Sequence, residues 1–173
     1  MRPMRRLSIL LVTIFALFLT VGTVTATREF FRAQAHADGH QEVPSVDTRA
    51  RGRANFRLKK DGSALIYRLN VSRLSNARFA HIHLGPEGSN GPIVAFLRKD
   101  RVDGPVKGRY AEGEITAADL LGPLAGQPLS ALVEAIEAGN TYINVHTDLN
   151  PAGEIRGQIE ERMIHDEHDE AAE

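Results

Sequence analysis

Apolar and polar side chains alternate over short stretches from about residue 50 onward, which is the pattern of half-buried β-strands. The stretch from Gly52 to Leu58 alternates, Asp61-Gly62 supplies a turn, and Leu65 to Val71 alternates again, so a β-hairpin is predicted there. Further strands are expected over residues 79–84, 93–97, 110–115, 142–147 and 154–159. Turn-forming residues separate these stretches, and the pattern therefore predicts an all-β, antiparallel barrel or sandwich.

Helical patterns are few and short. Thr116 and Asp119 fit a capping box before Leu120. The apolar residues between 129 and 136 follow helical spacing, with Ser130 as a cap and Gly139 as the stop. We therefore expect one or two short helices beside the sheet.

The amino terminus has the organisation of an export signal. Arg2, Arg5 and Arg6 precede an apolar run from Leu7 to Val24, and Val24-Thr25-Ala26 offers a cleavage site. Residues 1–26 are therefore predicted to be a signal peptide, followed by a linker over 27–37. The alternative is a retained membrane anchor, because the run approaches the length of a transmembrane helix. Either way the protein is expected outside the cytoplasm, secreted or periplasmic, and in contact with a membrane only if this leader is retained.

Composition limits the remaining possibilities. The 173 residues carry a net charge of −1 and no cysteine, so disulfides are excluded and nucleic acid is not an expected partner. Residues 38–160 are long enough for one domain of ordinary size. Residues 161–173 are rich in acidic side chains and are predicted to be a disordered tail.

Three histidines lie on two of the predicted strands. Because side chains alternate along a strand, His81 and His83 share a face with Phe79, and His146 shares a face with Asn144. Two histidines at this spacing have Cα atoms about 6.6 Å apart and can converge on one ion. The pattern predicts a surface or half-exposed site for one metal ion. The alternative is that the three rings only form hydrogen bonds, to loop carbonyls and to Asp148.

Imidazole ligands suit Cu(II), Zn(II) or Fe(II), and copper binds such sites most tightly, so copper is preferred over zinc. Asn144, Asp148 or Glu154 could orient a ligand ring from behind. Arg156 is expected on the polar face of the strand paired with that of His146, where it could steer a small anion to a redox-active ion.

Several motifs, in order along the chain, resemble those of the CHRD domain, named after chordin and widespread in bacterial secreted proteins. They are Gln41-Glu42-Val43-Pro44, Ala80-His81-Ile82-His83-Leu84-Gly85-Pro86, Asn90-Gly91-Pro92-Ile93-Val94, residues 139–147 and residues 150–158. The resemblance covers roughly residues 37–160. It implies an immunoglobulin-like β-barrel and an extracytoplasmic role, and it leaves open whether the domain has an enzymatic activity.

The histidine strands are also similar to the copper-ligand strands of copper/zinc superoxide dismutases, which would make His81, His83 and His146 copper ligands on a β-barrel. No histidine lies between His83 and His146, so the bridging and zinc-site histidines have no counterpart.

Three functions are therefore considered. The first is a binding module that carries a mononuclear copper site and recognises an unknown extracytoplasmic protein or glycan. The second is a copper-only, dismutase-like oxidoreductase. The third is a purely structural adhesion or matrix module.

Overall fold

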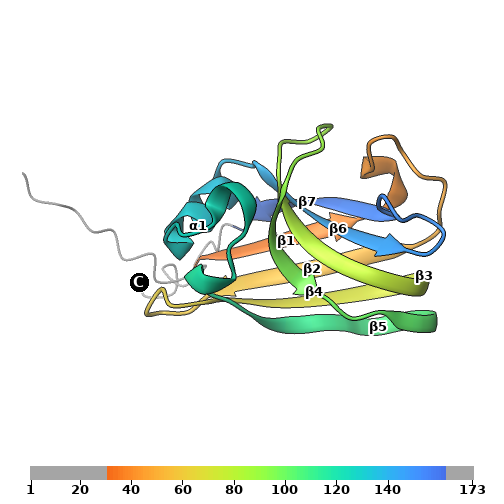
Figure 1. Cartoon of the computed structure of the whole chain (residues 1–173), viewed down its shortest axis with the longest axis horizontal. Helices are drawn as coiled ribbons and strands as arrows, with labels where there is room; N and C mark the ends of the chain where they lie inside the picture. Colours follow the sequence, from red (N-terminus) through yellow and green to blue (C-terminus); the bar gives the residue numbers. More distant parts are fainter. Residues whose placement is uncertain (1–30, 163–173) are drawn as a thin grey trace, which may run out of the picture.

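The computed structural model describes residues 31–162, which form a single β-structure with one α-helix at its end (Figure 1). The predicted signal peptide, the first residues of the predicted linker and most of the acidic tail lie outside the described residues. The strands are β1 Arg32–Ala37, β2 Arg51–Leu58, β3 Leu65–Leu84, β4 Ile93–Arg98, β5 Val102–Ile115, β6 Thr141–Thr147 and β7 Ile155–Glu161.

The strands close into an antiparallel barrel through the long strand β3. Strands β2, β1, β7 and β6 lie side by side in that order, and β3 pairs with both ends of this row. Its first half pairs with β2 from Leu65 to Ser72, and its second half pairs with β6 from Ala77 to Leu84. Strands β4 and β5 also pair with β3, outside this ring. The all-β, antiparallel barrel predicted from the sequence is confirmed, as is the hairpin of β2 and β3.

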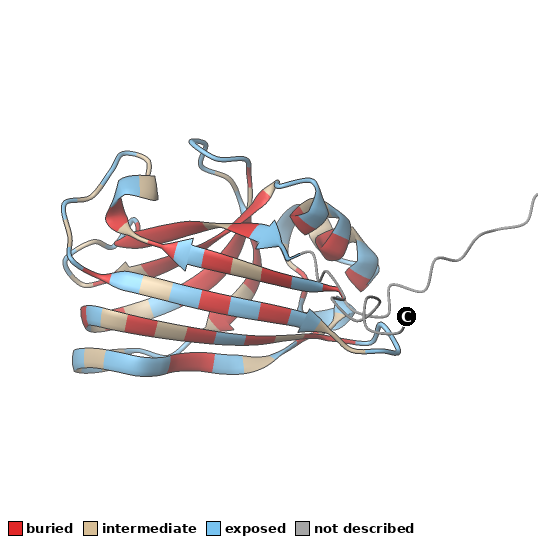
Figure 2. Ribbon diagram, turned by 180° about the vertical axis from the view of Figure 1, so that it is seen from behind, coloured by how far each residue is buried: buried red, intermediate tan, exposed pale blue. Residues whose placement is uncertain are grey.

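Alternation along the strands sorts side chains between the interior and the outer surface, as the banding in Figure 2 shows. Leu65, Leu69, Ile82, Ile143 and Ile155 are fully buried within the apolar core. Their neighbours along each strand face outward. Burial of such side chains stabilises the fold by about 1.5–3 kcal/mol each, and this packing holds the wall on which the histidines lie.

Helical structure is limited, as expected. The α-helix α1 (Leu129–Glu137) packs Leu132, Val133 and Ile136 against the core. It begins directly after Pro128, so Ser130 lies inside the helix and is not its cap. Three single turns of 3-10 helix complete the set: η1 Gly39–Gln41, η2 Ala117–Asp119 and η3 Gly122–Leu124. The predicted capping box of Thr116 and Asp119 is present at η2. Within residues 31–162, no helix is long and apolar enough to cross a membrane.

The structure differs from the sequence interpretation at the start of the domain. The segment 27–37 was predicted to be a linker, yet Arg32–Ala37 forms β1, which pairs with β2 on one side and β7 on the other. Its inward positions are Ala33, Ala35 and Ala37, all buried. Alanine is depleted in strands, so the alternation in this segment carries little strand signal until its partners are known.

Replacement of Ile143 by Ala tests whether β6 is anchored by the core. Ile143 is fully buried, so the change should lower the free energy of unfolding by about 2–5 kcal/mol, measured by urea denaturation. Leu149→Ala is the control, because Leu149 is 85% exposed, and its effect should stay within about 0.5 kcal/mol. Equal losses in the two variants would contradict the assignment of β6 to the core wall.

Candidate metal centre

The three histidines meet on the outer wall of the barrel, where β3 pairs with β6. His81 lies opposite Asn144, His83 opposite Tyr142, and His146 opposite Phe79. Directly opposed residues of an antiparallel pair share a face, so all three imidazoles lie on one side of the wall. The intervening Ile82 and Ile143 point into the core. The register of two strands far apart in the sequence therefore brings the predicted ligands together.

The imidazoles are close enough to share an ion. One nitrogen from each ring lies within 4.8 Å of the other two. His81 Nδ1 and His146 Nε2 are 3.1 Å apart. A trigonal ion with bonds near 2.0 Å separates its donor atoms by about 3.5 Å, so these two nitrogens already stand near bonding separation. The His83 nitrogen lies within 4.8 Å of both and would complete the set by moving closer to them.

The site is more buried than the sequence pattern indicated. A surface or half-exposed site was expected, yet His81 is 5% exposed and His83 is 9% exposed, while His146 is half-buried. Aromatic rings pack around them: Phe96 meets His81 edge-on at 4.6 Å between centroids, and Tyr142 stacks on His83 at 4.9 Å. Alternation along a strand assigns a face but does not show which loops and neighbouring strands cover it.

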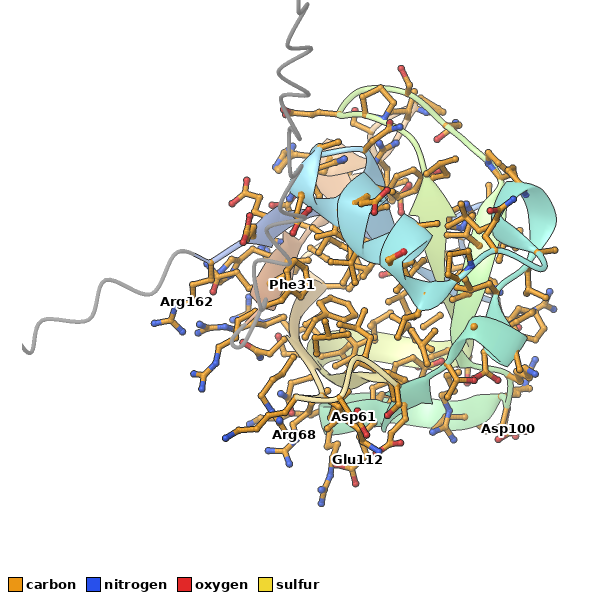
Figure 3. All side chains as sticks on the ribbon, turned by 90° about the vertical axis from the view of Figure 1, so that its left-hand side faces the viewer. Phe31, Asp61, Arg68, Asp100, Glu112 and Arg162 are labelled. Atoms are coloured by element: carbon orange, nitrogen blue, oxygen red, sulfur yellow. The ribbon has the colours of Figure 1, made fainter. Side chains whose placement is uncertain are left out.

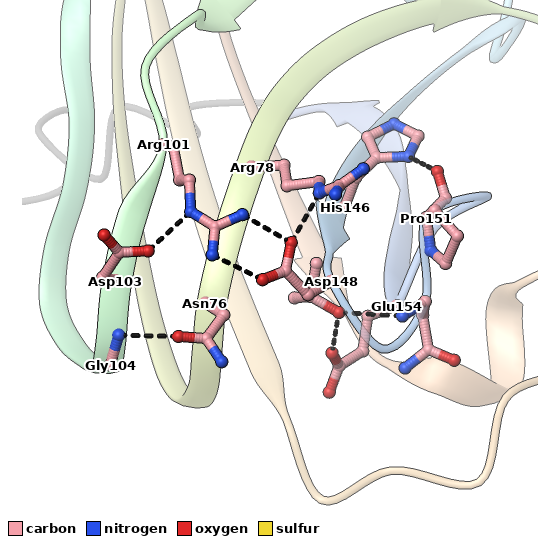
Figure 4. Close-up of polar contacts among 11 residues, drawn as sticks. Asn76, Arg78, Arg101, Asp103, Gly104, His146, Asp148, Pro151 and Glu154 are labelled. Atoms are coloured by element: carbon pink, nitrogen blue, oxygen red, sulfur yellow. Dashed lines mark hydrogen bonds and ion pairs between the residues drawn. The ribbon is translucent and has the colours of Figure 1, made fainter.

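Two backbone carbonyls fix the protonation of two of the rings. His83 Nδ1 lies 2.8 Å from the carbonyl oxygen of Gly91, and His146 Nδ1 lies 3.1 Å from that of Pro151 (Figure 4). A carbonyl only accepts, so each Nδ1 carries the hydrogen, and each Nε2 presents a lone pair. Such a backbone contact is the usual support behind a metal-binding histidine.

The Nε2 atom of His83 has no hydrogen-bond partner. Among the described residues, five buried side-chain nitrogen or oxygen atoms lack a hydrogen-bond partner, and this nitrogen is one of them. What distinguishes it is its position, because it belongs to a group of three imidazoles whose nitrogens converge. A buried acceptor without a partner costs about 1–3 kcal/mol, a cost that a bound ion would remove.

Burial keeps the three rings neutral. It lowers the pKa of His81 to about 3, with further lowering from His146 and His83. Burial also lowers the pKa of His83 and of His146, although the contacts with Gly91 and Pro151 act in the opposite direction. Since a metal ion binds the neutral ring, the cluster is in its ligating form throughout the neutral range.

Arg156, the residue predicted to steer an anion, is buried beside the cluster. It is 1% exposed, and its guanidinium lies 3.6 Å from the centre of the Tyr142 ring. Nη2 donates a hydrogen bond of 2.8 Å to the carbonyl of Pro86, and Nη1 donates one of 3.4 Å to Asn90. In this position Arg156 ties the loop after β3 to the barrel wall.

The three residues predicted to orient the ligand rings have other partners. Asn144 donates to both carboxylate oxygens of Glu42, at 3.1 and 3.2 Å. Glu154 accepts from the hydroxyl groups of Thr48 and Thr147. Asp148 accepts from Arg78 and from both terminal nitrogens of Arg101 (Figure 4). Within residues 31–162, the hydrogen bonds of the imidazoles go to Gly91, to Pro151 and to one another.

Glu42 is the residue near the site whose importance the pattern of side chains did not show. It is 7% exposed, and burial raises the pKa of its carboxyl to about 7, against the lowering effects of Asn144 and Arg156. The Gln41-Glu42-Val43-Pro44 motif was the one available signal, and it gave no role for Glu42. The structure places this carboxyl over Asn144, in the loop between β1 and β2.

Comparison with known proteins supports a family assignment. The family model of the CHRD domain matches residues 33–159. No curated protein matches the chain, and no solved structure matches it. The match extends from β1 into β7 and contains all three histidines. Since it covers well over half of the sequence, the chain belongs to the CHRD domain family.

Proposed function

We propose that this chain is an extracytoplasmic CHRD binding module that holds one copper ion through His81, His83 and His146. The observation that carries this proposal is the convergence of three neutral imidazoles, two of them with Nε2 lone pairs fixed by the carbonyls of Gly91 and Pro151. For His81, metal binding through Nδ1 requires its hydrogen to shift to Nε2. That is a change of tautomer and not a loss of a proton from the ring.

Copper fits this donor set best. The three ligands are all imidazoles, a set that suits copper and zinc, and copper has the higher intrinsic affinity among divalent ions. Magnesium and calcium prefer oxygen ligands, and the two buried carboxylates of the described residues are engaged elsewhere, Glu42 by Asn144 and Glu154 by Thr48 and Thr147. Zinc with three histidines and a water is the competing ion.

A binding role is favoured over redox catalysis by the position of Arg156. A dismutase-like reaction needs a small anion to reach the ion, and a solvent-accessible cation near the entrance assists this. Here the guanidinium is 1% exposed, covers the Tyr142 ring and is bonded to Pro86, so an incoming anion does not reach it. The location outside the cytoplasm is supported by family membership and by the leader-like sequence of residues 1–26.

Copper titration of the chain, purified without a polyhistidine tag, tests the site. The wild type should bind one equivalent tightly, and His83→Ala should weaken binding at least 100-fold because a ligand is lost. His36→Ala is the matched control, since His36 is exposed on β1 and should leave affinity unchanged. Isothermal titration calorimetry with a competing chelator gives the constants.

Two results would reject the copper site. Wild-type affinity in His83→Ala would place the ion on other histidines, and a failure of the folded wild type to bind copper or zinc would leave a module without metal. One bound copper with rapid superoxide turnover would instead favour the oxidoreductase.

The pH dependence of copper binding provides a separate test. Three histidines with the ordinary pKa of about 6.5 would lose roughly fiftyfold in affinity between pH 7.5 and pH 6, because each protonated ring cannot bind. Burial lowers the pKa of all three rings here, so proton competition begins only at more acidic pH. With His81 out of the competition, two rings at the ordinary pKa would lose roughly fourteenfold, and because the pKa of His83 and that of His146 are lowered as well, we expect a smaller loss than this, measured with a chelator calibrated at each pH. A fiftyfold fall would show that the rings titrate as exposed groups.

A further inference from the structure

The outer faces of β1, β2 and the first half of β3 form a surface that the metal centre does not use. Pairing of these strands places their outward residues in three rows across the sheet. We call these nine positions the arginine face: Arg32, Arg57 and Ile66; Gln34, Asn55 and Arg68; His36, Arg53 and Asn70.

The charges of this face are of one sign. Four of the nine side chains are arginine and none is a carboxylate. Arg32 lies directly opposite Arg57, an arrangement that destabilises a sheet unless an anion lies between the two groups. The acids come at the borders: Glu160 lies opposite Gln34 on β7, and Glu112 and Glu114 lie opposite Arg68 and Ile66 on β5.

Most of these groups are available to a ligand. Arg32, Arg53 and Arg57 are exposed, and within residues 31–162 their guanidinium groups form no hydrogen bond or ion pair. Arg68 makes one long contact of 3.6 Å with Glu112. Arg68 and Arg162 project on the same side of the barrel (Figure 3). Together with Arg32 and Arg57 they line an open hollow of about 700 Å³, which has four arginines and, at its β5 border, Glu112 and Glu114.

The chemistry of the face identifies the kind of ligand. Guanidinium groups bind carboxylates with two parallel hydrogen bonds, and the amides of Gln34, Asn55 and Asn70 both donate to and accept from hydroxyl groups. Within residues 31–162 these amide side chains form no hydrogen bonds to other residues. A polymer that carries both carboxylates and many hydroxyl groups can bind the arginines and the amide side chains at the same time.

Other anionic partners fit less well. Stacking of nucleic acid bases needs aromatic side chains, and the arginine face has none apart from His36. Insertion into a membrane needs exposed large apolar residues, and those of the described chain are Phe79, in the second half of β3, and Leu149, after β6, both outside the arginine face. We therefore propose that the arginine face binds an acidic polysaccharide, with carboxylates on the arginines and sugar hydroxyls on the amides. This surface uses β1, β2 and the first half of β3, whereas His81 and His83 lie in the second half of β3 and His146 on β6, so the arginine face acts without the ion.

Binding to immobilised alginate, a carboxylated polysaccharide, tests the proposal. The full chain is applied in the presence of EDTA, so that the metal centre does not contribute, and neutral dextran serves as the second surface. We expect alginate binding that weakens with added salt, and no binding to dextran. The double variant Arg53→Gln/Arg57→Gln should bind alginate about tenfold more weakly, since two charge-assisted contacts are lost.

The matched control removes the same charge elsewhere. Lys99→Gln/Lys107→Gln changes two exposed lysines on other elements and should retain wild-type affinity for alginate. Neither double variant should melt below the wild type, because the altered side chains are exposed and loss of Arg57 relieves its repulsion with Arg32. If Arg53→Gln/Arg57→Gln does not fold, Arg53→Lys/Arg57→Lys replaces it. Lysine keeps the positive charge but cannot form the two parallel hydrogen bonds of a guanidinium, so this variant should still bind alginate more weakly than the wild type.

Three outcomes would overturn the assignment. The first is no binding to alginate at low salt. The second is equal weakening in the control and in the arginine variant, which would indicate a general charge effect. The third is equal or tighter binding to duplex DNA or to vesicles containing phosphatidylglycerol at matched charge, which would show that phosphate and not a carboxylated sugar is recognised.

Discussion

The pairing of one long strand with two different partners is the constraint on which this structure depends. β3 runs over 20 residues, and its two halves contact β2 and β6, the two ends of the row of strands. This pairing closes the barrel. It also fixes the register that places His81 opposite Asn144 and His83 opposite Tyr142. A slip of one residue along β6 would turn His146 into the core and Val145 outward, so the apolar core selects the same register that assembles the histidines.

A second buried layer, made of polar side chains, lies on the outer side of this wall. Three charged side chains in this layer are nearly inaccessible to water, and each forms a hydrogen bond to a loop or a neighbouring strand. Arg156 donates to Pro86, Glu42 accepts from Asn144, and Glu154 accepts from Thr48. Burying such groups is costly unless they are hydrogen-bonded, so these contacts hold the loops before β2 and after β3 against the barrel. Both His83 Nε2 and Asn144 Oδ1 lack a partner in this layer, and the His83 nitrogen is the one that converges with two other imidazoles.

The metal centre and the arginine face use the outer wall in different ways. Around the histidines, loops and aromatic rings exclude water, which keeps the imidazoles neutral. On β1 and β2 the outward arginines are exposed among the residues that the structure describes, so they remain in contact with water. The same alternation along a strand therefore produces a buried ligand set in one place and an open cationic surface in another, and the difference comes from the connecting loops.

The sequence by itself determined the strand pattern, the hairpin of β2 and β3, the position of α1 and the family, because alternation, turn residues and ordered motifs are local properties of the chain. It also indicated that His81 and His83 share a face. The tertiary structure alone decided that β1 completes the barrel, since its alanines carry little strand signal until β2 and β7 pair with them. The tertiary structure likewise decided that the histidines are buried, that Gly91 and Pro151 fix their tautomers, and that Arg156 and Asp148 have other partners. These are contacts between residues distant along the chain, and periodicity within a single strand contains no information about which segments meet.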